Sequence, residues 1–571
     1  MAEFTLGSYA ARSCPVKTFN DFDPTLQQPA LNHSLRESFQ GGEDQRKLVL
    51  ASIVEQDSSM VDLRSLGTEH WAELEASTLG AMSDGADVVV GGVLPLDLAG
   101  HRSGRADVLV RGDDTPDGRP GYWPMRIKNY KVLERQVGCT DLQYSTIDDL
   151  GAMQVLPDLR YRAYRQAALL ELAHVWRLLE TAGFASATPL AGIVGTDKPH
   201  VPGEGPAVAW VRLDHRFLRT FSRTSPTGHR MRSALERYDH EHGFRVHVAE
   251  QAMRRTGVDD PEPVVRPIRV KECEWCAWWE VCRPRMDDDD LSLRISKTPL
   301  DVRELQTLMG LGIGTVAELA EADIEAILPQ YLPLTAHRDH SEQRLRTAAR
   351  RARMLAAGVE LERVSSDPIA VPRSDVEIDL DIETAERDVT YLWGVLVTDR
   401  RSGEQYYEHF SAFADQSGDE EVQLAVRFAR WLVDFVAAHP EALVFHYSDY
   451  ETVHLRRLAE RSNHPDLVAA CGLVRDHFVD LFGHVRDNFV GVDGLGLKVV
   501  ARKGAGFNWR DDDAGGLNSQ TWFAASISAE TDAGRAAART RVLEYNEDDV
   551  RATWAVREWL DGVDAGPPAG D

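Results

Sequence analysis

Acidic side chains recur in three separate stretches of the last third of this 571-residue chain. In the first stretch acidic and apolar residues alternate, a period of two that predicts a strand with one acidic face, made of Glu377, Asp379, Asp381 and Glu383. Like charges at this spacing repel by about 1–4 kcal/mol per close pair at an intermediate effective dielectric. A divalent cation would remove that repulsion, and so would water around an edge strand, so the strand alone leaves both explanations open.

The other two acidic stretches favour the cation. Asp449 and Glu451 follow an apolar strand and precede a predicted helix. Tyr545 and Asp549 stand at i and i+4 of a predicted helix that runs to Trp559, so they share one helical face. Hard cations such as Mg²⁺ and Mn²⁺ prefer oxygen ligands. Two of them can supply both the attacking hydroxide and the stabilised leaving oxygen that phosphodiester hydrolysis needs.

An Asp-x-Glu on a first strand, a carboxylate after a later strand and a Tyr-x3-Asp on a late helix resemble the DEDD exonucleases of the RNase H-like fold. The YprB-type ribonuclease H-like domain is the most similar, over roughly residues 370–560. The resemblance implies that two Mg²⁺ or Mn²⁺ ions are bound by Asp381, Glu383, Glu451 and Asp549. It also implies that Tyr545 orients the attacking water, since the residue five before Asp549 is Glu544 and not the His of the alternative subgroup.

The second motif departs from the family pattern of Asn-x3-Phe-Asp, because here it reads His446-x3-Tyr450-Glu451. Glutamate can still bind a metal, but its longer side chain leaves Asp449 as a rival ligand. Asp480 is either a further acidic contributor or a surface residue.

Three of the six cysteines form a C-x2-C-x5-C pattern at Cys273, Cys276 and Cys282, and Cys14 lies far upstream. Thiolates this close suit a zinc ion or an iron–sulfur cluster. The arrangement resembles the iron–sulfur RecB-like nucleases and implies a [4Fe-4S] cluster that joins the N-terminal segment to the end of a nuclease domain. A zinc site and buried cysteines without metal are the alternatives, whereas the two remaining cysteines are isolated.

Three segments between those cysteines resemble the PD-(D/E)XK pattern of RecB-like nucleases. They are residues 67–70, of the form G-x-x-H, the strand beginning at Asp107, and the segment ending at Lys128. The resemblance implies His70 and Asp107 as ligands of Mg²⁺ or Mn²⁺ and Lys128 as an activating lysine.

Two substitutions alter this pattern. Arg126 stands where a metal-binding carboxylate belongs, and Val175 replaces the tyrosine of the downstream motif. A cation in a metal site reverses the local electrostatics and removes one ligand. The N-terminal half is therefore either an active nuclease or a former nuclease that clamps or guides a strand.

A segment at 308–320 resembles one helix-hairpin-helix. Its glycines would let backbone N–H groups face a phosphate at a helix start, a contact that is independent of sequence; they are Gly310, Gly312 and Gly314. A hairpin that serves packing alone fits the same pattern.

Composition bounds these expectations. Hydrophobic residues make up 43% and charged residues 27%, which is typical of a globular protein, and no stretch is long and apolar enough for a membrane span. The N-terminus has no signal-peptide pattern, so we expect a cytoplasmic protein with no membrane partner. The 64 basic and 91 acidic residues give a formal charge of −27, which excludes a generally basic surface but not local basic grooves.

Alternating strand-like and helix-like patterns predict an α/β multidomain fold with three parts. Residues 1–290 are a RecB/PD-(D/E)XK-like domain with the cysteine cluster, with strands at 86–94, 107–111 and 122–128 and a helical run at 158–183. Residues 291–362 are a helical hairpin segment, and residues 363–571 are an RNase H-like exonuclease domain.

The order of these domains resembles a family of RecB-like nucleases with a C-terminal YprB-type domain. The resemblance implies a two-metal exonuclease that hydrolyses nucleic acid at single-stranded ends, in repair or defence. DNA is favoured as the substrate, and the choice between DNA and RNA stays open. Two alternatives remain open. One is a nucleic-acid-binding module without catalysis. The other is a subunit that needs a separate helicase, because the chain has no G-x4-GK[ST] phosphate loop. Cleavage polarity and oligomeric state are open as well.

Overall fold

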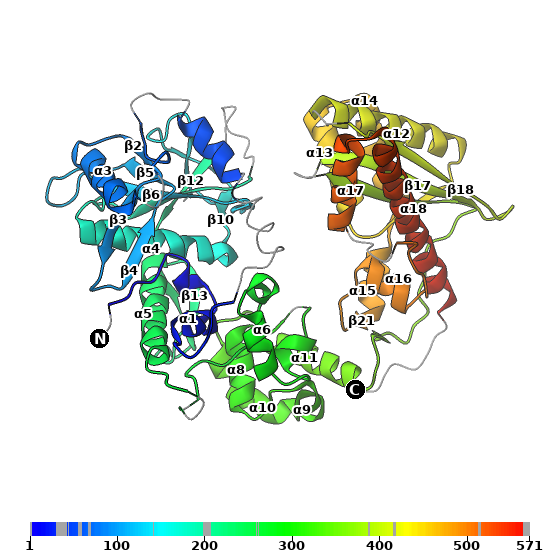
Figure 1. Cartoon of the computed structure of the whole chain (residues 1–571). Coiled ribbons are helices and arrows are strands. Elements are labelled where there is room, and N and C mark those ends of the chain that lie inside the picture. The colour runs from blue at the N-terminus through cyan, green and yellow to red at the C-terminus, as the bar shows by residue number, and fades with distance from the viewer. Residues whose placement is uncertain are drawn as a thin grey trace. The chain divides into compact units, whose positions relative to one another are not determined.

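The computed structural model describes residues 3–29, 43, 45–54, 60–66, 70–140, 142–197, 207–257, 260, 262–297, 299–385, 389–414, 418–511 and 516–563. The chain divides into two compact units (Figure 1). Unit 1 comprises Met1–Arg294, Leu300–Thr315 and Asp323–Leu345, and unit 2 comprises Ile295–Pro299, Val316–Ala322 and Arg346–Asp571. The helical segment expected at 291–362 is thus shared between the two units, and a three-part organisation stays a prediction.

Unit 1 is built on an eight-stranded mixed sheet. Its strands, in spatial order, are β1 (Val61–Asp62), β2 (Val88–Val90), β5 (Val108–Arg111), β6 (Tyr122–Ile127), β11 (Leu190–Val194), β12 (Ala207–Arg212), β8 (Gln143–Thr146) and β9 (Gln154–Val155). Three two-stranded sheets accompany it: β3 (Val93–Asp97) with β4 (Arg102–Arg105), β7 (Leu133–Arg135) with β10 (Leu159–Tyr161), and β13 (Leu218–Phe221) with β14 (His229–Arg232).

The helices of unit 1 are α1 (Pro15–Phe22), α3 (Trp71–Ser83), α4 (Gln166–Ala182), α5 (Ala234–Ala252), α6 (Trp279–Cys282), α7 (Leu291–Arg294), α8 (Val302–Gly310) and α10 (Ile324–Thr335). Among them, α3 and α4 pack against the sheet, α5 packs on α1 and α4, and α8 packs on α10. Helix α11 (Ser341–Ala356) continues from unit 1 into unit 2, and α9 (Val316–Glu321) is assigned to unit 2.

Two sequence predictions for unit 1 need correction. The strand expected at 86–94 is broken at Gly91, which adopts a φ of +74°. Before the break β2 pairs with β5, and after it β3 pairs with β4. The helix expected from 158 begins only at Gln166, since Leu159–Tyr161 pairs as β10 with β7. Its predicted end is confirmed, where Gly183 takes the left-handed conformation with φ +75°.

Unit 2 is built on a five-stranded sheet in the order β18 (Glu404–Ser411), β17 (Val389–Asp399), β16 (Val376–Ala385), β19 (Leu443–His446) and β20 (Phe478–Asp480). The first three strands are antiparallel, and β16, β19 and β20 are parallel. A small pair is formed by β15 (Leu361–Arg363) and β21 (Phe489–Gly491). The helices are α12 (Gly418–Ala438), α13 (Tyr450–Ser462), α14 (Pro465–His477), α15 (Leu481–Asn488), α16 (Leu497–Lys503), α17 (Gly516–Ser528) and α18 (Asp532–Gly562).

The central strand β16 has the predicted alternation. Ile378, Leu380 and Ile382 pack in one hydrophobic cluster with residues of α12, α13 and α14. The acidic residues therefore point to the opposite face, where α18 packs against β16 and β17. None of the helices that the model describes is both long and apolar enough to cross a membrane.

Candidate functional site

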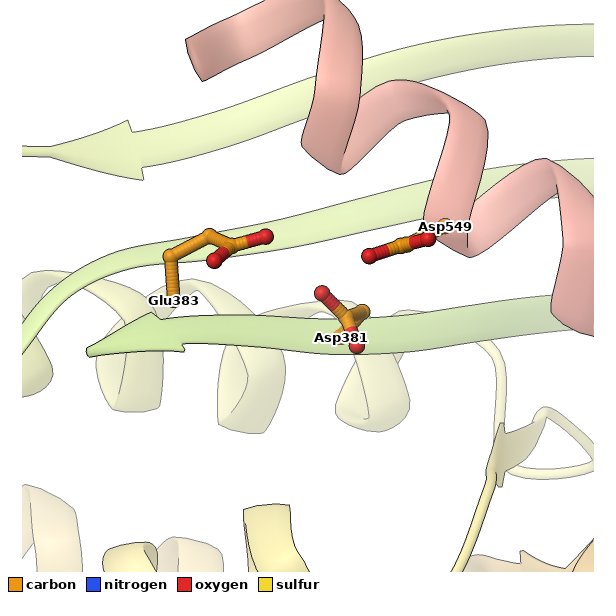
Figure 2. Close-up of side chains that lie close together, drawn as sticks. All are labelled: Asp381, Glu383 and Asp549. Atoms are coloured by element: carbon orange, nitrogen blue, oxygen red, sulfur yellow. The ribbon is translucent and has the colours of Figure 1, made fainter. Parts of the chain in front are cut away.

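Strand β16 and helix α18 bring three carboxylates together (Figure 2). One oxygen each of Asp381, Glu383 and Asp549 lies within 4.8 Å of the other two. The first two residues share the acidic face of the strand, and Asp549 comes from a position more than 160 residues later in the chain. An all-oxygen set at this spacing has the donor chemistry that Mg²⁺ or Mn²⁺ prefers.

The four acids of β16 fall into two pairs with different partners. Glu377 and Asp379 are completely buried, and both pair with Arg557 of α18. Arg373 also pairs with Glu377, at 2.9 Å. Within the described part of the chain, no arginine pairs with Asp381 or Glu383. The protein neutralises Glu377 and Asp379 with its own cations, whereas Asp381 and Glu383 have no such partner in the described part of the chain.

Neutral donors hold each carboxylate of the trio in place. The Asn546 amide donates to Asp381 at 2.8 Å, the Ser519 hydroxyl to Glu383 at 2.5 Å, and the Trp509 indole N–H to Asp549 at 2.6 Å. Such bonds orient metal ligands without supplying the positive charge that would replace a metal.

Asn546 is itself fixed from two sides. Its amide oxygen accepts a hydrogen bond from the Tyr407 hydroxyl at 2.8 Å. Gly394 of β17, which pairs with Asp381, leaves the room that this amide needs, because a Cβ at that position would lie 1.7 Å from the Asn546 oxygen. The close approach explains why the strand has glycine there.

Burial and mutual repulsion disfavour ionisation of the trio. Burial and the neighbouring Asp549 raise the pKa of Glu383 to about 8, and burial raises the pKa of Asp549 to about 6. The pKa of Asp381 is also raised, by burial and then by the carboxylates of Asp549 and Glu383. Three carboxylates that cannot all ionise alone near neutral pH are a fitting site for a divalent cation, which favours their charged form.

Lys498 of α16 is a functional candidate that the sequence did not reveal. Its ammonium donates to the Tyr545 hydroxyl at 2.7 Å and lies 4.7 Å from the centre of that ring. Its charge lowers the pKa of all three trio carboxylates. A lone lysine with no spacing signal around it gave no indication of this role.

Tyr545 lies on α18, one turn before Asp549 and on the same face of the helix. Burial, together with the charges of Asp549, Glu383 and Asp381, raises the pKa of the Tyr545 phenol, so the phenol stays protonated. The buried Tyr545 ring packs edge-on against Trp522.

Glu451 is close to the trio but does not belong to it. It lies in the first turn of α13, 4% exposed, and its charge adds to the raised pKa of Asp381. Burial, then the charges of Asp480 and Asp449, raise its own pKa to about 8. Its Oε2 accepts no hydrogen bond from any described residue, and the imidazole Nδ1 of His446 lies 3.7 Å from it. Burial lowers the pKa of His446, which favours the neutral ring.

The two rival acids have different positions. Asp480 accepts hydrogen bonds from the backbone N–H groups of Ser448, at 2.8 Å, and Phe482, at 2.9 Å, and it caps α15. This is a structural role at the end of β20. Asp449 is the exposed N-cap residue of α13.

In unit 1 the expected metal ligand Asp107 is already paired. It is 3% exposed and accepts contacts from Arg46 at 2.8 Å, Arg126 at 3.1 Å and the backbone N–H of Ile127 at 3.0 Å. Lys128 donates to both oxygens of Glu171 at 2.9 Å. These arginines supply the positive charge that a metal would bring, so the geometry does not favour the cation site expected at Asp107.

The remaining residues of the expected nuclease pattern do not join that cluster. His70 is exposed at the N-terminus of α3, and residues 67–69 lie outside the described part of the chain. Val175 of α4 is completely buried in a hydrophobic cluster.

The four cysteines of the predicted cluster line one cavity, together with Lys17, Glu272 and Trp278. Backbone and side-chain donors surround the sulfurs: Asn20 Nδ2 lies 3.6 Å from Cys282 Sγ, and the Val270 N–H lies 3.4 Å from Cys273 Sγ. Burial raises the pKa of Cys282 to about 11, so without a metal this thiol stays neutral.

The spacing of these sulfurs bears on the identity of the group they would hold. In the described part of the chain no three of them lie within 4.8 Å of one another. A tetrahedral zinc ion with Zn–S bonds of about 2.3 Å would bring its sulfurs to about 3.8 Å of one another. As a set of three, the sulfurs do not meet that spacing in the described structure, and the identity of the group that they would hold stays a prediction.

The glycines of the expected hairpin lie at the turn between α8 and α9. Gly312 has a φ of +83°, and the N–H of Leu291 donates to the Gly314 carbonyl at 3.0 Å. Gly310 is the last residue of α8. The positive φ at Gly312 is a backbone conformation that glycine adopts without strain. Phosphate binding at this turn stays a prediction.

A family model of the RNase H superfamily, RNase_H_2, matches residues 378–561. The C-terminal domain is therefore RNase H-like, a fold typical of nucleases, and the match contains all three members of the trio. The match does not extend to earlier residues, so the resemblance of the N-terminal half to iron–sulfur RecB-like nucleases stays a prediction. No match was found among curated proteins or among solved structures.

Proposed function

We propose that the protein is a divalent-metal-dependent exonuclease that hydrolyses phosphodiester bonds at single-stranded DNA ends, with its active site on β16 and α18. A role in DNA repair or defence would suit this activity. The observation that carries the proposal is the convergence of Asp381, Glu383 and Asp549 with no arginine or lysine paired to them in the described structure. The match to the RNase H superfamily supports the reaction class.

The chain's own residues would divide the work as follows. The trio would hold Mg²⁺ or Mn²⁺, and Glu451, whose buried Oε2 accepts no hydrogen bond from a described residue, is the candidate fourth ligand. When bound, such ions supply an activated hydroxide and stabilise the leaving oxygen. Tyr545, kept protonated, would orient the attacking water through its hydroxyl. Lys498 would fix that hydroxyl and offer positive charge to the scissile phosphate.

End-labelled single-stranded DNA, single-stranded RNA and duplex DNA, each with Mg²⁺, Mn²⁺ or a chelator, test this proposal. We expect metal-dependent shortening of single-stranded DNA from one end, lowered about a thousandfold in Asp381→Asn and Asp549→Asn. Asp375→Asn is the matched control, because that exposed carboxylate pairs with Arg401 at the surface of the same unit.

The outcomes separate the competing functions. Full activity in both trio variants would overturn the site assignment. Tight binding of DNA without cleavage under any metal would indicate a binding module. Cleavage that appears only with a co-purifying helicase would indicate a nuclease subunit. Shortening of RNA but not DNA would overturn the choice of substrate.

We further propose that Cys14, Cys273, Cys276 and Cys282 hold a [4Fe-4S] cluster. The shared cavity and the N–H donors beside two of the sulfurs support this group. When bound, it would join α1, which follows Cys14, to α6, which ends at Cys282.

An anaerobic absorption spectrum with iron, sulfide and zinc analysis tests the cluster. A brown protein with about four irons per chain supports it. A colourless protein with one zinc, or with neither metal after anaerobic purification, would overturn it.

A further inference from the structure

Unit 1 contains a concentration of positive charge that the proposed active site does not use. Asp107 pairs with Arg46 and Arg126, and Glu171 pairs with Lys128 at 2.9 Å and with Arg12 at 2.9 Å. Two buried carboxylates thus face four cations. In a chain with a formal charge of −27, such a local surplus needs a reason.

Arg105 adds a fifth cation to this cluster. Its side chain is exposed and forms no ion pair with any described residue. Partial burial, and then the charges of Arg46 and Arg126, lower the pKa of Arg105. Glu43, which is also exposed, acts in the opposite direction, because its negative charge raises the pKa of Arg105. Among the described residues of this cluster, the five cations still outnumber the three carboxylates when Glu43 is counted as fully effective.

The donors of this cluster are not all used. Arg126 is only 11% exposed, yet its Nε donates no hydrogen bond to a described residue, and the nearest carboxylate oxygen, of Glu171, is 4.0 Å away. A buried guanidinium N–H without an acceptor costs free energy. An anionic oxygen is the acceptor that would satisfy it, since guanidinium groups bind phosphate oxygens well.

An aromatic ring lies at the edge of the cluster. Tyr9 is 37% exposed, and the guanidinium of Arg12 stacks on it at 3.7 Å from the ring centre. Cations along a surface with an exposed aromatic ring are the combination that holds single-stranded nucleic acid, by phosphate contacts and base stacking.

We propose that unit 1 binds the phosphodiester backbone of single-stranded nucleic acid at this Arg12–Arg46–Arg105–Arg126 cluster, with Tyr9 stacking against a base. The cluster is an anion site rather than a cation site, and it binds without cutting. The inference rests on the proposed function for the choice of nucleic acid as the anion, but not on any step of cleavage.

Fluorescence anisotropy with labelled oligothymidylate, over a series of salt concentrations, tests it. The full chain carries Asp549→Asn so that cleavage does not interfere, and Arg46→Gln/Arg105→Gln is added to it. We expect affinity to fall about tenfold and the slope of log affinity against log salt to become shallower by about 2. Arg212→Gln/Arg216→Gln is the matched control, because it removes two surface charges of the same unit that pair with Asp214 and Glu236.

Arg105→Gln alone guards against misfolding, because Arg105 has no ion pair to lose with a described residue; we expect about half of the change in slope. Equal affinity and slope in the cluster variants and the control would overturn the proposal. So would displacement of the oligonucleotide by inorganic phosphate at constant ionic strength, which would indicate a site for single phosphate groups. Wild-type protein that binds through the cluster but never cleaves would overturn the proposed nuclease function and leave this inference standing.

Discussion

Arg557 of α18 donates two hydrogen bonds to Asp379, at 2.8 and 3.1 Å, and both side chains are fully buried. Asp381 lies two residues further along the same face of β16, and the Asn546 amide takes the place that a guanidinium has at Asp379. The same helix therefore gives Asp379 a cationic partner and Asp381 a neutral one. This difference makes the two residues a natural pair of probes.

The metal-free protein should respond in opposite directions to the same substitution at these two positions. Asp379→Asn leaves Arg557 without part of its counter-charge and should lower the free energy of unfolding by about 3–5 kcal/mol. Asp381→Asn removes one of three repelling carboxylates and should raise the melting temperature in a chelator. Thermal denaturation with and without Mg²⁺ measures both. Equal destabilisation by the two variants would mean that Asp381 is a structural residue.

Lys498→Met should lower the turnover number about 10–100-fold, because Tyr545 loses the ammonium that fixes its hydroxyl. The apparent affinity for Mg²⁺ should not weaken, since a competing cation is removed from beside the trio. Lys498→Arg should restore part of the activity. Single-turnover cleavage at varied Mg²⁺ separates the two effects, and a loss of Mg²⁺ affinity with unchanged turnover would contradict this positioning role. Lys503→Met, at an exposed residue of the same helix that pairs with Glu360, is the control.

Cys14→Ala and Cys282→Ala should each abolish the iron content and visible absorption of the purified protein and lower the melting temperature of unit 1. The reason is that these two residues come from opposite ends of the stretch that the cluster would join. Cys139→Ala and Cys471→Ala are the controls, as neither residue lines the cavity. Iron content that survives in Cys14→Ala would exclude that residue as a ligand.

Unit 1 should lose stability in mild acid through His174. Its Nε2 contacts the Ser103 carbonyl at 3.0 Å and its Nδ1 contacts the Tyr238 hydroxyl at 2.9 Å, so both nitrogens are used by the neutral ring. Burial lowers the pKa of His174 to about 3. The unfolded chain binds a proton below about pH 6.5 and the folded one does not, so this contribution is complete above that pH and falls as the pH drops.

The expected loss is about 2 kcal/mol at about pH 5. Chemical denaturation at several pH values, followed by hydrogen exchange in α4, measures it. His174→Gln should flatten this part of the profile even if it is less stable throughout. An unchanged slope in that variant would show that other groups cause the acid sensitivity.

Much of unit 2 could be predicted because its signals are local. Alternation of acidic and apolar residues predicts β16 and its two faces, and the i, i+4 spacing places Tyr545 and Asp549 on one side of a helix. Both patterns depend only on neighbours along the chain. The broken strand at Gly91 was missed because a single positive φ outweighed a run of β-branched residues.

The sequence by itself determined which residue types are available: a strand with four acids, a late helix with a tyrosine and an aspartate, and four cysteines in two segments. Only the tertiary structure decided how those charges are compensated. Arg557 forms an ion pair with Asp379 and not with Asp381. Arg46 and Arg126 form ion pairs with Asp107. Lys498 donates a hydrogen bond to Tyr545. Charge compensation depends on distances of a few ångströms between residues far apart in sequence, and no local pattern encodes them.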